Sequence, residues 1–151
     1  MLRNIGGVIV GYVLMALIIF LTFTIAYLLM GANNAFEPNT YQVSNLWLVT
    51  SFLLAFGAAM MGGYACAAIA GARSRAPIAL AVLVIVIGVL AAVPTLRAAN
   101  AGRDRLTRPA EVSNMEAMQN AVQPGWIAVL NPIIGAGAIL LGASLRRRPR
   151  S

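Results

Sequence analysis

The chain has 151 residues, of which 60 % are hydrophobic and 10 % charged, and its formal net charge is +7. A soluble domain carries about 25 % charged residues, so this composition excludes the soluble globular class. There is no histidine and only one cysteine, Cys66, which removes the usual ligand sets for zinc, haem, copper and iron–sulfur clusters. No nucleophile–base set is evident either. We therefore expect no catalytic residue, no metal site and no cofactor, in a protein that is not an enzyme.

Four stretches without any charged residue indicate the architecture. They cover residues 5–30, 46–70, 78–96 and 126–145. A membrane-spanning helix needs about 20 mainly apolar residues, and each stretch reaches that length or comes within a residue of it. The sequence predicts an all-α membrane protein, a single four-transmembrane-helix bundle over residues 1–151 with one sizeable loop at residues 97–125.

The first span, residues 5–30, combines a packing motif with two hydroxyl groups. Gly7 and Gly11 form a GxxxG pair, and in lipid such small residues allow two helix backbones to approach closely. Thr22 and Thr24 lie toward the other end of the span. The apolar run exceeds the core of a signal peptide, which is about 7–15 residues long, so we expect a retained helix.

The second span, residues 46–70, is expected to be the centre of the bundle. Small residues at a spacing of four give it a face with almost no side chains, which suits close contact with two neighbouring helices. This packing face comprises Ala55, Ala59, Gly63 and Ala67. Thr50 and Ser51 lie near the start of the span, at a depth similar to that of the threonines in the first span.

The third span and the following loop differ in character. Residues 78–96 form a plain Val/Ile/Leu run with Gly88 and Ala92, and we expect much of this helix to face lipid. In the loop at 97–125, Ser113 and Glu116 match a capping box ahead of an apolar periodicity, which predicts a short amphipathic helix. Such a helix suits a cap on the bundle, or a lid or docking surface, and the sequence does not decide between them.

The fourth span, residues 126–145, adds Gly135 and Gly142 as packing residues, and Asn131 as a polar group followed by Pro132. We expect the polar residues of three spans to lie at one level. These candidates for a polar pocket are Thr22, Thr24, Thr50, Ser51 and Asn131. Such a pocket would hold a lipid or quinone headgroup. The alternative is ordinary packing, with the hydroxyls bonded to their own helices and the asparagine bridging two helices.

Arginine is distributed unevenly around the spans. Seven of the eleven arginines flank the chain termini and the short link after the second span, whereas four lie in the loop at 97–125 beside three acidic residues. The positive-inside rule then places both termini in the cytoplasm, N-in and C-in. Trp47 and Trp126 begin spans on the opposite side, where interfacial tryptophans are common. We expect the cytoplasmic (inner) membrane of a bacterium.

The spans contain no ionisable acid or base, which argues against a pump or a proton-coupled carrier. The function expected first is a non-enzymatic accessory subunit, or an assembly or scaffold factor. The alternative is a small oligomeric permease or channel for an uncharged or lipidic solute. The expected partners are membrane lipids and either a membrane-protein partner or a homo-oligomer. No nucleic acid is expected, because an arginine-rich tail directly after a span suits anionic lipid.

The arginine asymmetry predicts which positions an impermeant thiol reagent reaches on intact cells. In a Cys66→Ala background, the single-cysteine variants Asn39→Cys and Thr107→Cys should be labelled, whereas Ser151→Cys should not. All three should react after the cells are permeabilised. Labelling of Ser151→Cys alone on intact cells would contradict the N-in/C-in topology and indicate the opposite orientation.

Overall fold

The computed structural model describes residues 2–71, 74–100, 107, 116 and 120–147. Its helices are α1 (Leu2–Ala35), α2 (Asn45–Ala70), α3 (Ala76–Asn100) and α5 (Gly125–Arg147). All four are long and apolar enough to cross a membrane, which confirms the expectation of an all-helical chain with four such helices for the described residues. The amphipathic helix predicted in the loop at 97–125 falls largely outside the described residues.

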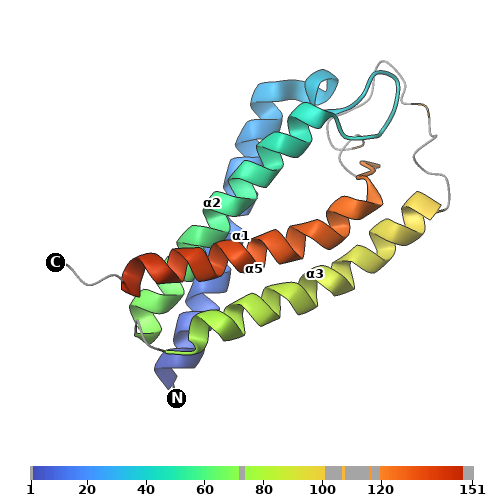
Figure 1. The fold of residues 1–151 in the computed structure, drawn as a ribbon. Coiled ribbons are helices and arrows are strands. Elements are labelled where there is room, and N and C mark those ends of the chain that lie inside the picture. The colour runs from blue at the N-terminus through green and yellow to red at the C-terminus, as the bar shows by residue number, and fades with distance from the viewer. Residues whose placement is uncertain (1, 72–73, 101–106, 108–115, 117–119, 148–151) are drawn as a thin grey trace.

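The helices form two antiparallel pairs, α1 with α2 and α3 with α5 (Figure 1). The pairs meet at the end of the molecule where both termini lie, and they diverge toward the opposite end. We call these the terminal end and the loop end. Between the pairs, α2 packs extensively on α5, whereas α1 meets α3 in a much smaller contact. The bundle is therefore wedge-shaped, with α2 and α5 joining its two halves.

Close backbone contact joins α1 to α2 near the terminal end. A Cβ atom at Gly7 would lie 2.9 Å from the Cβ of Ala70, and one at Gly11 would lie 2.8 Å from the carbonyl oxygen of Gly62. The approach is reciprocal, because a Cβ at Gly62 would lie 2.7 Å from the carbonyl oxygen of Gly11. Real Cβ atoms do not approach so closely, so only glycine permits this helix separation.

A second pair of glycines joins α2 to α5. A Cβ at Gly63 would overlap the carbonyl group of Ile139, and one at Gly142 would overlap the carbonyl group of Met60. Ala59 and Ala67 are also buried in α2. One helix thus uses different small residues against two neighbours, which brings three helix backbones together at the terminal end.

One face of α3 is packed, whereas most of its large apolar side chains are exposed, as the sequence led us to expect. A Cβ at Gly88 would overlap the ring of Pro132 in α5, so the glycine provides space for the proline. Nearer the terminal end, Leu80 and Ala81 are buried in the core. The opposite face of α3 is exposed, as at Leu90.

The α1–α2 connection has its own hydrogen bonds. α1 bends at Gly31, whose φ of 69° and ψ of 166° lie in a region that favours glycine. The Ser44 hydroxyl then donates to the carbonyl oxygen of Asn34 at 2.5 Å and accepts from the Trp47 backbone N–H at 3.1 Å. Ser44 is thereby the N-cap of α2 and also ties its start to the end of α1.

The 36–44 loop attaches the start of α5 to the first helix pair. Its Val43 N–H donates to the carbonyl oxygen of Val122 at 3.1 Å, and the Val122 N–H donates to the carbonyl oxygen of Tyr41 at 2.9 Å. An apolar cluster lies beside these bonds, and its buried members are Tyr27, Ala35, Phe36, Val43, Leu48 and Ile127. As a result α5 is fixed to the α1–α2 pair at both of its ends.

The overlap at Gly63 predicts a position-specific cost of adding one methyl group. Gly63→Ala should lower the free energy of unfolding by about 1–3 kcal/mol, because α2 and α5 must move apart. Gly57→Ala is the matched control, since its added Cβ meets no atom within 4 Å. Thermal unfolding in mild detergent would compare them, and equal melting temperatures would contradict the α2–α5 contact.

Candidate functional site

The divergence of the helix pairs leaves a cleft with a volume of about 390 Å³. Residues from all four helices line it, together with Gln123 just before α5. The packed α2 and α5 form its back, and α1 and α3 form its sides, which separate toward the loop end (Figure 1). The volume lies within the range of about 300–1,000 Å³ that is usual for sites that bind small organic molecules.

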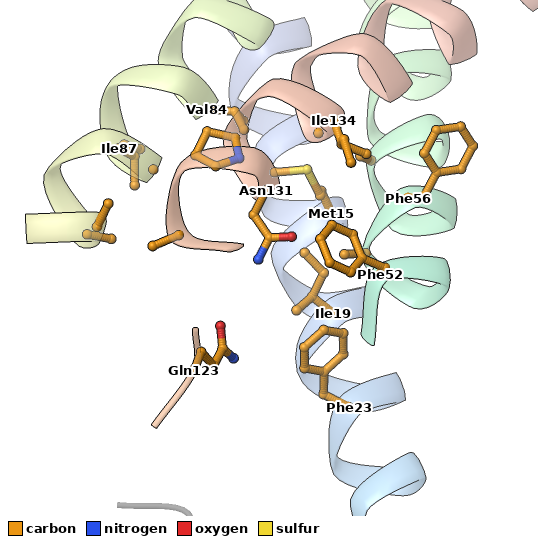
Figure 2. Close-up of a pocket in the computed structure, with 18 of the residues that line it drawn as sticks. Met15, Ile19, Phe23, Phe52, Phe56, Val84, Ile87, Gln123, Asn131 and Ile134 are labelled. Carbon is orange, nitrogen blue, oxygen red and sulfur yellow. The ribbon is translucent and has the colours of Figure 1, made fainter. Parts of the chain in front are cut away.

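The two walls of the cleft differ in chemistry. Phe23 of α1 and Phe52 and Phe56 of α2 give one wall an aromatic surface (Figure 2). Val84 and Ile87 of α3 lie across the cavity and give the other wall an aliphatic surface. A ligand in this space would contact rings on one side and branched side chains on the other.

Two carboxamides interrupt this apolar lining. Figure 2 shows Asn131 of α5 and Gln123 extending into the same part of the cavity. Among the residues that the structure describes, neither side chain has a hydrogen-bond partner. Moving an amide from water to an apolar medium without a new hydrogen bond costs about 2–7 kcal/mol. In the structure Asn131 is exposed and Gln123 is half-buried. Both amides are therefore accessible to a molecule in the cleft, and in an apolar surrounding each would be stabilised by a hydrogen bond to it.

Of the predicted polar-pocket residues, only Asn131 lines this cleft. The hydroxyl of Thr22 donates to the carbonyl oxygen of Ile18 at 2.7 Å, and that of Ser51 donates to the carbonyl oxygen of Leu48 at 2.9 Å. These are bonds within one helix, which was the alternative expected from the sequence. These bonds give both hydroxyl groups a hydrogen-bond acceptor within the protein, so neither group needs a ligand.

The other two predicted hydroxyls also lie away from the cleft. Thr24 donates to the carbonyl oxygen of Phe20 at 2.7 Å and borders an adjoining groove along α1, which shares part of its lining with the cleft. Thr50 is half-buried and does not line the cleft. A similar depth in the sequence did not bring the five residues together, because each helix is rotated by its own packing contacts.

Several small residues expected only to pack helices also border the cavity. Ala55, Ala59 and Gly135 line it, and their small size leaves the space open. The residues that the sequence did not single out are Gln123 and the three phenylalanines. A partial signal was present, because Phe52 and Phe56 are four residues apart on one face of a helix.

The lining carries no formal charge, since none of its residues is Asp, Glu, Lys or Arg. Cys66 is buried in the core of the terminal end instead. Among the described residues, no group of three His, Cys, Asp or Glu side chains is placed to hold a metal ion. The cleft offers apolar contact area, two hydrogen-bonding amides and the Tyr12 side chain.

Comparisons of the chain with protein-family models, with curated proteins and with solved structures find no match.

The free carboxamide of Asn131 predicts a small effect on stability. Asn131→Ala should change the free energy of unfolding by less than about 0.5 kcal/mol, because no hydrogen bond to the described protein is lost. A bridge between helices would instead cost about 1–2 kcal/mol. Ser44→Ala serves as a positive control, with an expected loss of about 1 kcal/mol for the N-cap. Thermal unfolding in detergent separates these outcomes.

Proposed function

We propose that this chain is a non-enzymatic membrane protein that takes up an uncharged, lipid-soluble molecule in the cleft between its two helix pairs. The observation that carries the proposal is the presence of two unpaired carboxamides, Asn131 and Gln123, in a mainly apolar cavity of the described chain. Apolar pockets with a few convergent polar groups are the common form of small-molecule sites. This proposal develops the expectation of a permease for an uncharged or lipidic solute.

The arrangement of α1 and α3 supports entry from the bilayer. These helices meet near the terminal end, where a Cβ at Gly11 would lie 3.0 Å from the Leu80 Cδ2 atom. Farther along the two helices diverge (Figure 1), and Phe23 of α1 and Ile87 of α3 line the cleft from its two sides (Figure 2). A lipid-soluble molecule would pass between them without leaving the apolar phase.

The lining supports an uncharged ligand. Removing an ion from water costs several kcal/mol even after the protein relaxes, unless a counter-charge lies nearby. None of the residues that line the cleft carries such a charge. The carboxamides offer both donors and acceptors, which suits carbonyl, ester or hydroxyl groups.

We further propose the N-in/C-in topology, in the cytoplasmic membrane of a bacterium. Arg3, Arg75, Arg146 and Arg147 lie at the terminal end of the described structure, whereas Arg97 lies toward the loop end. The positive-inside rule then puts the terminal end in the cytoplasm and the wide part of the cleft in the outer leaflet. The loop at 97–125, with its predicted amphipathic helix, would lie outside the cell.

A second candidate role is that of an accessory subunit, and a groove along α1 favours it. This groove has a volume of about 460 Å³ and lies beside Phe20, Tyr27 and Trp47. The neighbouring Leu17 and Leu21 are exposed. A helix of a partner protein, or of a second copy of this chain, would cover these side chains.

Retention of a bound molecule tests the first proposal. Protein purified in mild detergent should carry a neutral lipid-soluble compound in near-equal molar amount, as measured by extraction and mass spectrometry. Ala55→Leu should reduce the retained amount at least tenfold, because it fills the cleft. Ala68→Leu is the matched control on the exposed surface of the same helix.

Two results would contradict the cleft proposal. One is equal retention by Ala55→Leu and Ala68→Leu. The other is purified protein without any bound compound but with a stoichiometric protein partner, which would favour the accessory role.

A further inference from the structure

We infer that the molecule held in the cleft is a prenylated quinone, a neutral lipid whose flat ring carries two carbonyl oxygens. This inference rests on the proposed uptake of a lipid-soluble molecule, and it specifies the chemical class of that molecule. It combines three features of the described residues: an aromatic wall, two unpaired carboxamides, and the divergence of α1 from α3, between which a lipid would enter.

The aromatic wall favours a flat ring over a flexible chain. Phe23, Phe52 and Phe56 approach the cavity from two helices, and their rings line one side of it (Figure 2). Aromatic rings gain more from contact with another ring, stacked or edge-on, than from equal contact with an alkyl chain. The acyl chains of ordinary lipids would fill the space but would not gain this additional stabilisation from ring–ring contact.

The carboxamides favour a ring with oxygen substituents. The side-chain NH₂ groups of Asn131 and Gln123 can each donate to a carbonyl oxygen, and their own oxygens can accept from the hydroxyls of the reduced ring. Two free amides in one part of the cavity thus suit a head with two oxygens. A plain hydrocarbon would leave both amides without partners.

The opening between α1 and α3 accommodates the prenyl tail. Ile19 of α1 and Ile87 of α3 border the cavity on its two sides and are apolar. With the ring near Asn131, the tail would leave between these helices and continue among the acyl chains. The cavity of about 390 Å³ then needs to hold only the head and the first part of the tail.

The lining also indicates what happens to the ring. Reduction of a quinone takes up two electrons and two protons, and the Tyr12 hydroxyl is the one ionisable side-chain group among the described residues that line the cleft. The ring would be bound and released unchanged. The proposed role of the site is therefore to hold the quinone or pass it on.

Trp47 provides a direct readout of occupancy. Its ring centroid lies 5.9 Å from that of Phe23, which lines the cleft. In the Trp126→Phe variant, Trp47 is the sole tryptophan, and quinones quench indole fluorescence. Titration with decyl-benzoquinone in detergent micelles should give saturable quenching. Asn131→Leu and Gln123→Leu, each in this background, should weaken the apparent affinity at least tenfold while the melting temperature stays unchanged.

Two comparisons separate specific binding from other effects. In the Trp47→Phe variant only the exposed Trp126 remains, so quenching by the same quinone should be linear. Monoolein with a dibrominated chain is a neutral lipid without a ring, and its bromines also quench tryptophan. It should quench Trp47 only linearly.

The two probes lead to different conclusions. Saturable quenching by the quinone alone supports the inference. Saturable quenching by brominated monoolein, alone or with equal affinity, overturns the preference for a ring but leaves the proposed uptake of a neutral lipid intact. Linear quenching by both probes overturns both. Unchanged quinone affinity in Asn131→Leu and Gln123→Leu overturns the assigned role of the carboxamides.

Discussion

The contact of backbone on backbone between α2 and α5 is the constraint on which the rest of the structure depends. At Gly63 and Gly142 no side chain separates the two helices, so they touch at the terminal end. Farther along α2, Phe52 and Phe56 occupy the space toward α5. Glycines allow two helix backbones to touch, whereas large side chains require a greater separation. The wedge shape and the cleft both follow from this change in side-chain size along α2.

The 36–44 loop limits how far the divergence goes. Its hydrogen bonds to Val122, and the burial of Ile127 beside Tyr27 and Leu48, hold the start of α5 against the first helix pair. Between this attachment and the glycine contacts, α5 spans the back of the cleft and carries Asn131 within it. Gln123 follows the attached residue directly, so its position depends on the same bonds. The polar groups are therefore held on a fixed wall, whereas the side between α1 and α3 has few constraints.

The sequence was sufficient to predict the four helices because a lipid bilayer allows an apolar segment of this length only a helical structure. Backbone groups in a bilayer must be satisfied within each helix, so apolar runs such as 78–96 leave no alternative structure. Packing was harder to predict. Gly63 and Gly142 could be recognised as interface residues, but their partners Ile139 and Met60 depend on helix rotation, which no local pattern specifies.

The cleft could be predicted least. Asn131 was identified because a carboxamide is unusual in a span. Thr22 and Ser51 were identified with it, but their hydroxyls donate hydrogen bonds to carbonyl oxygens of their own helices. Phenylalanines in an apolar helix are equally consistent with lipid-facing positions, so the spacing of Phe52 and Phe56 placed them on one helix face but did not assign that face to a cleft. Gln123 owes its place to hydrogen bonds between Val122 and the distant residues Tyr41 and Val43, and such long-range pairings have no periodic signature.

The hydrogen bonds of the α1–α2 connection have a consequence for biosynthesis. The bonds of Ser44 to Asn34 and Trp47, and the glycine contacts of Gly11 with Gly62, involve only the first 71 residues. Chains emerge from the ribosome N-terminus first, and early units can become organised before later ones exist. The α1–α2 hairpin can thus insert into the membrane and pack as a unit. The α3–α5 hairpin must then dock onto a surface that is already formed. The cleft forms only at this final step, when the backbone of Val122 forms its hydrogen bonds with the backbone groups of Tyr41 and Val43.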